Sequence, residues 1–249
     1  MEKIFKRKYI VALLIIIQFF SVRAAGAKDN RPWGVGEDLI FSIRWGFITA
    51  GYANMEVKEE LTLNGKPTYR IVTQARSAGF FDPFYKVRDV VQSYIDKEKL
   101  RTVRFQKKLR EGSYKKDSTV IYDYENMTAY ENGNKFEITE HTQDVLSSLY
   151  YLRFEDIEVG KVFEFDVGTG KKLWPLKVTI KKKEKIKVPA GKFDTFLVVP
   201  ELREEGIFKA KGKLNIWITV DKRKFPVLMK CKIPVGSISA VLIDKKLSK

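Results

Sequence analysis

The chain has 249 residues, of which 47 are Lys or Arg and 31 are Asp or Glu, so its formal net charge is +16. It contains one cysteine, Cys231, and one histidine, His141, which excludes an internal disulfide and any metal centre built from several Cys or His ligands. A nucleophilic hydrolase would have only one residue available as its usual histidine base.

The beginning of the chain has the three parts of an export signal. Basic residues at positions 3, 6, 7 and 8 precede the apolar run IVALLIIIQFF, and the small residues AAGA follow it. The run has eleven residues, whereas a helix that spans a bilayer needs about 20. We therefore expect residues 1–27 to be a cleavable signal peptide, with an uncleaved anchor or cleavage after Ala24 as the alternatives. No cysteine lies near the junction, which excludes lipid attachment at a new N-terminal Cys.

The mature protein is expected to be periplasmic or secreted, with no transmembrane segment after cleavage. Removal of residues 1–27 takes away five basic residues and one acidic residue, which leaves a net charge of +12. Outside the cytoplasm such a surface favours lipid phosphates, acidic glycans and lipopolysaccharide rather than nucleic acid, so an anionic envelope surface is an expected partner. Alternatively, lysines such as those in KVTIKKKEKIKV only solvate a sheet face and prevent edge pairing.

From residue 37 onward, apolar and polar residues alternate with period two, which is typical of strands with one buried face. The first run places large apolar residues at positions 39, 41, 43, 45 and 47, and later runs cover 174–180, 214–220 and 227–233. Asn64-Gly65 and Asn132-Gly133 predict hairpin turns, because both residues of a tight hairpin turn must accept positive φ. Weaker turn signals lie at 111–112, 189–191 and 221–226.

The stretch RWGFITAGYANMEV, residues 44–57, interrupts the first alternating run with small residues at 49–51. We interpret it as the junction of the first two strands, where small residues relieve crowding as the chain turns. On this interpretation Trp45 and Phe47 continue the buried face of the first strand.

One segment has helical spacing instead. In HTQDVLSSLYYLRFED, residues 141–156, apolar residues fall at 145, 146, 149 and 152, and Thr142 or Gln143-Asp144 could cap the start. We expect one short helix near 143–153, over the open end or mouth of the sheet. The sequence thus predicts an all-β, mainly antiparallel fold. We expect a strongly curved sheet or incomplete β-barrel of about 11–13 strands, forming a single domain over residues 28–249.

Motifs for enzymatic chemistry are absent from the sequence. It has no G-x-S-x-G, no G-x-G-x-x-G, no P-loop and no calcium-loop motif, so we expect no catalytic residue, no metal and no cofactor. His141 stands in a polar neighbourhood, and we expect it to be exposed. Paired carboxylates for glycan chemistry stay open, and no sequence argument rejects Asp82, Asp89, Asp144 or Asp221.

Aromatic residues concentrate in the 44–57 stretch, the GFFDPFY loop and the expected helix. Such side chains can line a concave apolar pocket in which a few polar groups orient the ligand. Arg153 would counter an anionic headgroup at the cavity mouth. Core packing of the aromatic rings and a structural ion pair of Arg153 are the alternatives. The candidate ligand-binding residues are Trp45, Phe47, Tyr52, Tyr150, Tyr151 and Arg153.

Four stretches of the chain resemble a known protein family, in which they occur in the same order. They are VGEDLIFSIRWGFITAGYANMEV, DVLSSLYYLR, VPAGKFDTFLVVP and WITVDKRKFPVLMKCKIPVGSISAVL. Together they resemble DUF3108, a bacterial family of exported proteins of unknown function, over about residues 35–243. The resemblance implies an exported envelope protein and supplies no catalytic residues. The shorter stretch WITVDKRKFPVLMK is similar to the LolA-like lipoprotein carriers, whose curved sheets enclose an apolar cavity beneath a helical lid, which favours a lipid-type ligand.

Three functions follow from these observations. The first is an exported, non-enzymatic binding or carrier protein for an apolar or amphiphilic cell-envelope molecule, a lipid or glycan whose phosphate or acidic sugar meets basic residues. The second is a structural envelope protein with a solid sheet that docks on polysaccharide, peptidoglycan or a membrane complex. The third is a glycan-active enzyme, which requires two carboxylates about 5–9.5 Å apart in one cleft. An empty or a filled sheet interior separates the first function from the second.

Overall fold

A computed structural model describes residues 31–201, 214–233 and 236–248. The fold is that of residues 32–249, the second of the chain's two units. The predicted signal peptide, residues 1–27, lies outside the described residues. No helix in the described ranges is long and apolar enough to cross a membrane.

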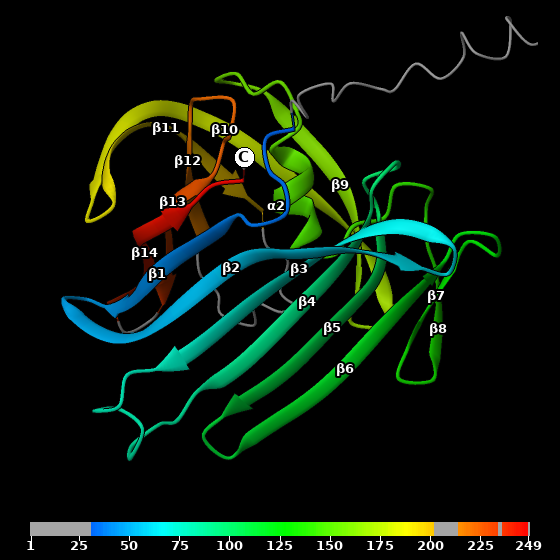
Figure 1. The fold of residues 1–249 in the computed structure, drawn as a ribbon, viewed down its shortest axis with the longest axis horizontal. Helices are drawn as coiled ribbons and strands as arrows, with labels where there is room; N and C mark the ends of the chain where they lie inside the picture. Colours follow the sequence, from blue (N-terminus) through cyan, green and yellow to red (C-terminus); the bar gives the residue numbers. More distant parts are fainter. Residues whose placement is uncertain (1–30, 202–213, 234–235, 249) are drawn as a thin grey trace, which may run out of the picture. The chain divides into compact units, whose positions relative to one another are not determined.

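The second unit is built on one antiparallel sheet of 14 strands in the order β8-β7-β6-β5-β4-β3-β2-β1-β14-β13-β12-β11-β10-β9 (Figure 1). The predicted all-β fold with one short helix is confirmed, with slightly more strands than expected because four-residue strands carry little alternation. The strands are β1 (Asp38–Trp45), β2 (Ile48–Leu63), β3 (Lys66–Ser77), β4 (Arg88–Asp96), β5 (Thr102–Glu111), β6 (Tyr114–Asp123), β7 (Thr128–Glu131), β8 (Asn134–Glu137), β9 (Val162–Thr169), β10 (Lys172–Val188), β11 (Gly191–Pro200), β12 (Leu214–Thr219), β13 (Pro226–Ile233) and β14 (Gly236–Lys246).

Both Asn-Gly pairs form the predicted hairpin turns. Asn64 and Gly65 have φ values of 52° and 75° and connect β2 to β3, where Leu63 pairs with Lys66. Asn132 and Gly133 have φ values of 47° and 82° and connect β7 to β8. Positive φ at both turn residues matches the right-handed twist of the flanking strands, so these turns fix the register of the two hairpins.

The first hairpin turns at Gly46 and Phe47, since Trp45 pairs with Ile48. Gly46 supplies a φ of 58°. The strand junction predicted in this stretch is confirmed, but the prediction that Trp45 and Phe47 continue the buried face is wrong. Trp45 is 47% exposed and Phe47 is fully exposed. The alternation of apolar and polar residues continues to the end of β1. The tip of the hairpin, however, projects beyond the hydrophobic cores, so its apolar side chains are exposed (Figure 1).

Small residues beyond this turn allow β2 to bend. Ala50 is an extra residue in the pairing with β1 and forms a β-bulge. Gly51, the next residue, lies so close to β3 that an added Cβ would stand 2.3 Å from the carbonyl oxygen of Arg76. The small residues at 49–51 therefore serve the bend and the close approach of two strands.

The single described helix, α2 (Ser147–Leu152), lies against the concave face of the sheet, between the β1–β6 half and the β9–β14 half (Figure 1). It has six residues and is flanked by turns, so it is shorter than the segment predicted near 143–153. Leu146 and Tyr150 belong to a hydrophobic cluster with residues of β1–β4, whereas Leu152 belongs to a cluster with residues of β9–β12. The helix thus joins two cores.

The sheet does not close, since its order begins at β8 and ends at β9. The segment before α2 bridges the two edges. The amide of Gln143 donates to the carbonyl of Asp166, and the amide of Gly168 donates to the carbonyl of Gln143, each at 2.8 Å. The hydroxyl of Tyr122 on β6 also donates to the carbonyl of Gly168 on β9. These bonds hold the edges near each other and keep the sheet strongly curved.

Candidate functional site

A cavity of about 390 Å³ lies inside the curved sheet beside α2 and is partly open to solvent. Each of the strands β1–β5 and β9–β14 contributes at least one side chain to its wall, as does α2. Most of these side chains are apolar, because they occupy the alternate strand positions that face the interior of the sheet. The volume falls in the range of about 300–1,000 Å³ that is usual for sites of small ligands.

Two alanines keep part of this space open. Ala53 on β2 pairs with Phe41, and Ala240 on β14 pairs with Ile43 and Met229. All five residues line the cavity. A large side chain at either alanine would extend into the space that its neighbours leave, so the side chains of the described residues do not fill the sheet interior.

Asp144 anchors the start of α2 to β4 and β5. Its Oδ1 accepts hydrogen bonds from the amides of Leu146 at 2.7 Å and Ser147 at 2.9 Å. Its Oδ2 accepts from the hydroxyls of Ser93 at 2.6 Å and Thr102 at 3.0 Å. Complete burial raises the pKa of Asp144, and the four hydrogen bonds oppose that effect. The helix begins after Leu146, which is its N-cap and makes no side-chain cap hydrogen bond, so the predicted cap at Thr142 or Gln143-Asp144 is wrong. Asp144 lies two residues before that position and holds the turn that leads into the helix.

Arg153 anchors the other end of α2 through an ion pair with Glu37. The two side chains are fully buried, and two parallel N–H···O contacts of 2.7 Å join Nη1 to Oε1 and Nη2 to Oε2. Nη2 also donates to the carbonyl of Pro32 at 3.2 Å, and Nε donates to the carbonyl of Arg223 at 3.1 Å. The guanidinium is therefore saturated by the protein itself, as the alternative of a structural ion pair requires.

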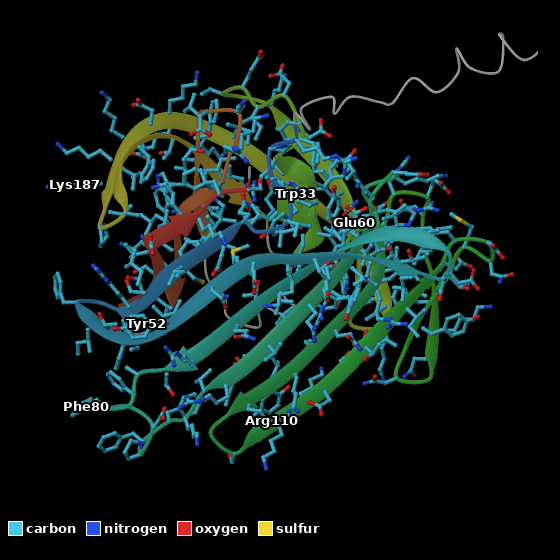
Figure 2. The ribbon with its side chains drawn as sticks, in the orientation of Figure 1. Trp33, Tyr52, Glu60, Phe80, Arg110 and Lys187 are labelled. Carbon is cyan, nitrogen blue, oxygen red and sulfur yellow. The ribbon has the colours of Figure 1, made fainter. Side chains whose placement is uncertain are left out.

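Trp33 seals the core beside this ion pair. Its indole nitrogen donates to the carbonyl of Tyr150 at 2.9 Å, and its ring makes edge contacts with Tyr69 and Tyr150, each at 5.1 Å, and with Phe154 at 5.4 Å. Figure 2 shows Trp33 beside the helix. The segment before β1 thus covers one side of α2.

The six residues predicted to bind a ligand do not come together. Trp45, Phe47 and Tyr52 are exposed on the β1–β2 hairpin, whereas Tyr150 and Arg153 are buried in the core. Tyr151 is half-buried, and its ring lies 5.7 Å from that of Phe165. None of the six lines the cavity. The six residues lie in two short stretches of the sequence. In the structure, however, the tip of the β1–β2 hairpin is exposed to solvent, whereas the inner side of α2 is buried in the core.

The acidic residues considered for glycan chemistry have separate structural roles. Asp82 accepts from Ser77 and Arg88, each at 2.5 Å, whereas Asp89 accepts from the amide of Arg110. Asp221 accepts from amides in the β12–β13 turn. Among the described residues, one carboxylate lines the cavity, that of Glu201.

His141 is exposed, as predicted. In the described part of the chain, no group of three or more His, Cys, Asp or Glu side chains is placed to hold a metal ion.

Sequence reasoning missed three polar residues of the cavity wall, namely Lys107, Thr73 and Thr169. A signal for Lys107 exists in the sequence FQKKL. Phe105, Lys107 and Leu109 occupy alternate positions of one strand, so a lysine stands in the apolar phase. Lys107 is only 7% exposed. A charged residue at a strand position that alternation assigns to the buried face is thus a better indicator of this site than the aromatic residues of the predicted set.

Comparisons with known proteins place the chain among proteins without an assigned function. The model of DUF3108, described as a protein of unknown function, matches residues 40–243. No curated protein matches the chain.

Solved structures resemble the fold. A beta-barrel-like protein of the domain of unknown function DUF1849 from Brucella abortus is 11% identical, covers 87% of this chain and 99% of its own, and has a TM-score of 0.57. A protein described as exported, with a YmcC-like fold, from Bacteroides fragilis is 11% identical over 87% and 98% of the two chains, with a TM-score of 0.39. A protein described as a lipoprotein from Parabacteroides distasonis is 10% identical over 87% and 98%, with a TM-score of 0.35. At these identities the first similarity concerns the fold alone.

The buried ion pair gives a prediction about stability. Glu37→Gln leaves the Arg153 guanidinium buried without its counter-charge, so we expect the free energy of unfolding to fall by about 3–5 kcal/mol. The control is Glu60→Gln, which removes the partner of Lys97 from a half-exposed pair and should cost about 0–1 kcal/mol. Chemical denaturation of both variants measures the difference. Equal losses would contradict the role given to Glu37.

Proposed function

The chain belongs to the DUF3108 family of proteins of unknown function, and we propose that it is an exported, non-enzymatic binding or carrier protein. Its ligand is an apolar or amphiphilic molecule of the cell envelope. The observation that carries this proposal is the apolar cavity of about 390 Å³ beside α2. The molecule enters with its apolar part against the strands and the helix.

The physical basis of binding is removal of the ligand's apolar surface from water. Each buried CH2 group contributes about 0.8 kcal/mol, so a medium-length alkyl chain supplies enough free energy for a specific complex even after the entropic costs of association. Met55 and Met229 in the wall have unbranched, flexible side chains that adapt to such a chain. A ligand of this class needs no enzymatic group in the cavity.

The same cavity weighs against the two alternatives. A structural protein with a solid sheet would have its interior filled by side chains, and here Ala53 and Ala240 leave space. A glycan-active enzyme needs two carboxylates in one cleft. Glu201 is the one carboxylate that the described residues supply to the cavity, and its Oε1 lies 3.7 Å from the ammonium of Lys177.

Export and surface charge support the same role. The sequence of residues 1–27 has the organisation of a signal peptide, and the mature chain keeps a net charge of +12. Exposed lysines at positions 181–183 on β10 present part of this charge to solvent. A periplasmic carrier with such a surface would approach anionic lipids or glycans by long-range attraction.

Filling the cavity tests the proposal. Ala240→Phe places a ring in the space beside Ile43 and Met229, so we expect binding of the apolar dye N-phenyl-1-naphthylamine to weaken about tenfold or more, which corresponds to at least about 1.4 kcal/mol. Dye fluorescence and its displacement by 1-dodecanol measure the affinity.

The matched control is Ser239→Phe, the neighbouring position on the opposite face of β14, which does not line the cavity. Thermal unfolding of both variants checks that each is folded. The proposal fails if the wild-type protein binds neither compound, or if both variants bind the dye as well as the wild type does.

A further inference from the structure

Lys107 is an unusual component of an apolar cavity wall. It lies on β5 between Phe105 and Leu109 in the buried phase of the strand, and only 7% of its surface is exposed. Within residues 31–201, 214–233 and 236–248, its ammonium forms no hydrogen bond and no ion pair. Burial, and to a smaller extent the charge of Lys116, lowers the pKa of Lys107, whereas Glu131 opposes the shift. The ammonium is not among the fully buried atoms that lack a partner, so it keeps some contact with the open space of the cavity. A lysine that loses most of its hydration in an apolar wall and gains no protein partner in exchange calls for an explanation.

The nearest acidic group does not neutralise this lysine by contact. Ser118 is paired with Lys107 across β5 and β6, and its hydroxyl donates to Oε1 of Glu131 at 2.5 Å. Oε2 of Glu131 accepts from the amide of Lys171 at 2.9 Å. Both oxygens of Glu131 therefore have other donors, and the carboxylate holds the end of β7 to the β9–β10 turn.

Two hydroxyl groups in the same wall also have unused hydrogen-bonding capacity. Oγ1 of Thr73 and Oγ1 of Thr169 are buried and have no hydrogen-bond partner among the described residues, and both side chains line the cavity. Thr73 pairs with Val91, which pairs with Lys107, so Thr73 and Lys107 lie in one row on the concave face of the sheet. In the described wall the carboxylate of Glu201 lies 3.7 Å from the ammonium of Lys177, and the hydroxyl of Ser148 donates to the carbonyl of Val145. What is left among the apolar side chains is one cation and two hydroxyl groups without partners among the described residues.

We propose that Lys107 binds the acidic headgroup of an amphiphile, a carboxylate or a phosphate monoester, whose alkyl chain occupies the apolar part of the cavity. This inference rests on the proposed carrier function and adds the charge of the ligand. The anion forms a charge-assisted hydrogen bond with the ammonium, and such bonds are about twice as strong as neutral ones. The hydroxyls of Thr73 and Thr169 donate to further headgroup oxygens as the ligand settles.

The test compares ligands that share one chain and differ in headgroup. We expect laurate and dodecyl phosphate to displace N-phenyl-1-naphthylamine about tenfold or more tightly than 1-dodecanol does, and dodecylamine to bind weakest. Lys107→Met keeps the length of the side chain and removes the charge. It should abolish the preference for the acids and leave the affinity for 1-dodecanol unchanged, whereas Lys108→Met, on the exposed face of the same strand, should behave as the wild type.

A second measurement separates this role from a structural one. Since Lys107 has no partner among the described residues, Lys107→Met should unfold at the same or a higher temperature than the wild type. A large loss of stability would show that Lys107 is a structural residue and overturn the assignment. Equal binding of laurate and 1-dodecanol would overturn the headgroup role and leave the carrier function standing. Binding of neither compound would overturn both.

A separate observation concerns the end of the sheet that carries the β1–β2 hairpin. Large aromatic side chains are exposed there on three neighbouring connections, and we call them the aromatic end. Phe80 and Tyr52 project outward near this end (Figure 2). The connections adjoin because Ala78 donates to the carbonyl of Ala50 at 2.8 Å and Gly112 donates to that of Lys86 at 2.8 Å. The aromatic end consists of Phe47 (105% exposed), Phe80 (78%), Phe84 (79%), Tyr85 (52%) and Tyr114 (49%).

Charge at the aromatic end indicates the partner. Arg76, Lys86, Lys115 and Lys116 are exposed on the same connections and strand ends. Of the nearby carboxylates, Asp82 is paired with Arg88, Asp117 is paired with Arg110, and Glu111 is half-buried. Exposed rings that project from loop tips, surrounded by cations, suit the headgroup region of a bilayer with anionic lipids. We infer that the aromatic end contacts an anionic lipid surface.

Vesicle sedimentation tests the lipid contact. The wild-type protein should sediment with vesicles of phosphatidylcholine and phosphatidylglycerol, and Phe80→Ser combined with Phe84→Ser should weaken this binding about tenfold or more, because two apolar rings no longer leave water. The matched control combines Ile121→Ser with Tyr130→Ser, two exposed residues on β6 and β7, and should retain binding. Absence of binding by the wild type, or equal binding by the Phe80/Phe84 variant, would overturn the inference.

Discussion

The ion pair between Arg153 and Glu37 fixes the end of α2 to the residues that lead into β1, and the rest of the interior depends on where that helix lies. A helix of six residues has no stability of its own in water, because its nucleation is too costly for so few hydrogen bonds. At its other end Asp144 bonds to Ser93 and Thr102 on two strands. Buried polar contacts at both ends thus hold a short helix inside a curved sheet.

This arrangement explains why the sheet can stay open and still enclose a cavity. The residues before α2 follow β8 at one edge of the sheet and form hydrogen bonds to β9 at the other edge, so they bring the two edges together. The helix covers part of the concave face. Alanines on β2 and β14 and the lysine on β5 then determine what the remaining space accepts. Space, apolar walls and one cation without a partner among the described residues are together what the proposed site for an acidic amphiphile requires. The proposed lipid contact of the aromatic end would bring this site to a surface where such molecules reside.

Much of the fold was predictable from sequence, because strand alternation and Asn-Gly turns depend on local physics. The start of the helix was placed less well, because Asp144 accepts from the amides of Leu146 and Ser147 while the N-cap itself is Leu146. The partner of Arg153 was not, since Glu37 lies 116 residues away and many acidic residues compete for that position. Alternation also failed at Trp45 and Phe47, because a period-two pattern says which residues share a face but not whether another layer covers that face. The cavity wall was missed because its indicators are small residues and one misplaced lysine rather than aromatic rings.

The account depends most on the claim that the cavity holds a molecule with an alkyl chain. Organic extraction of the full-length protein after its export in a bacterial host, followed by mass spectrometry of the extract, tests this claim most directly. The account predicts a co-purified acidic amphiphile in a molar ratio approaching one per chain, depleted in the Ala240→Phe variant. An extract free of such molecules, from protein that also takes up none when they are added, would contradict it.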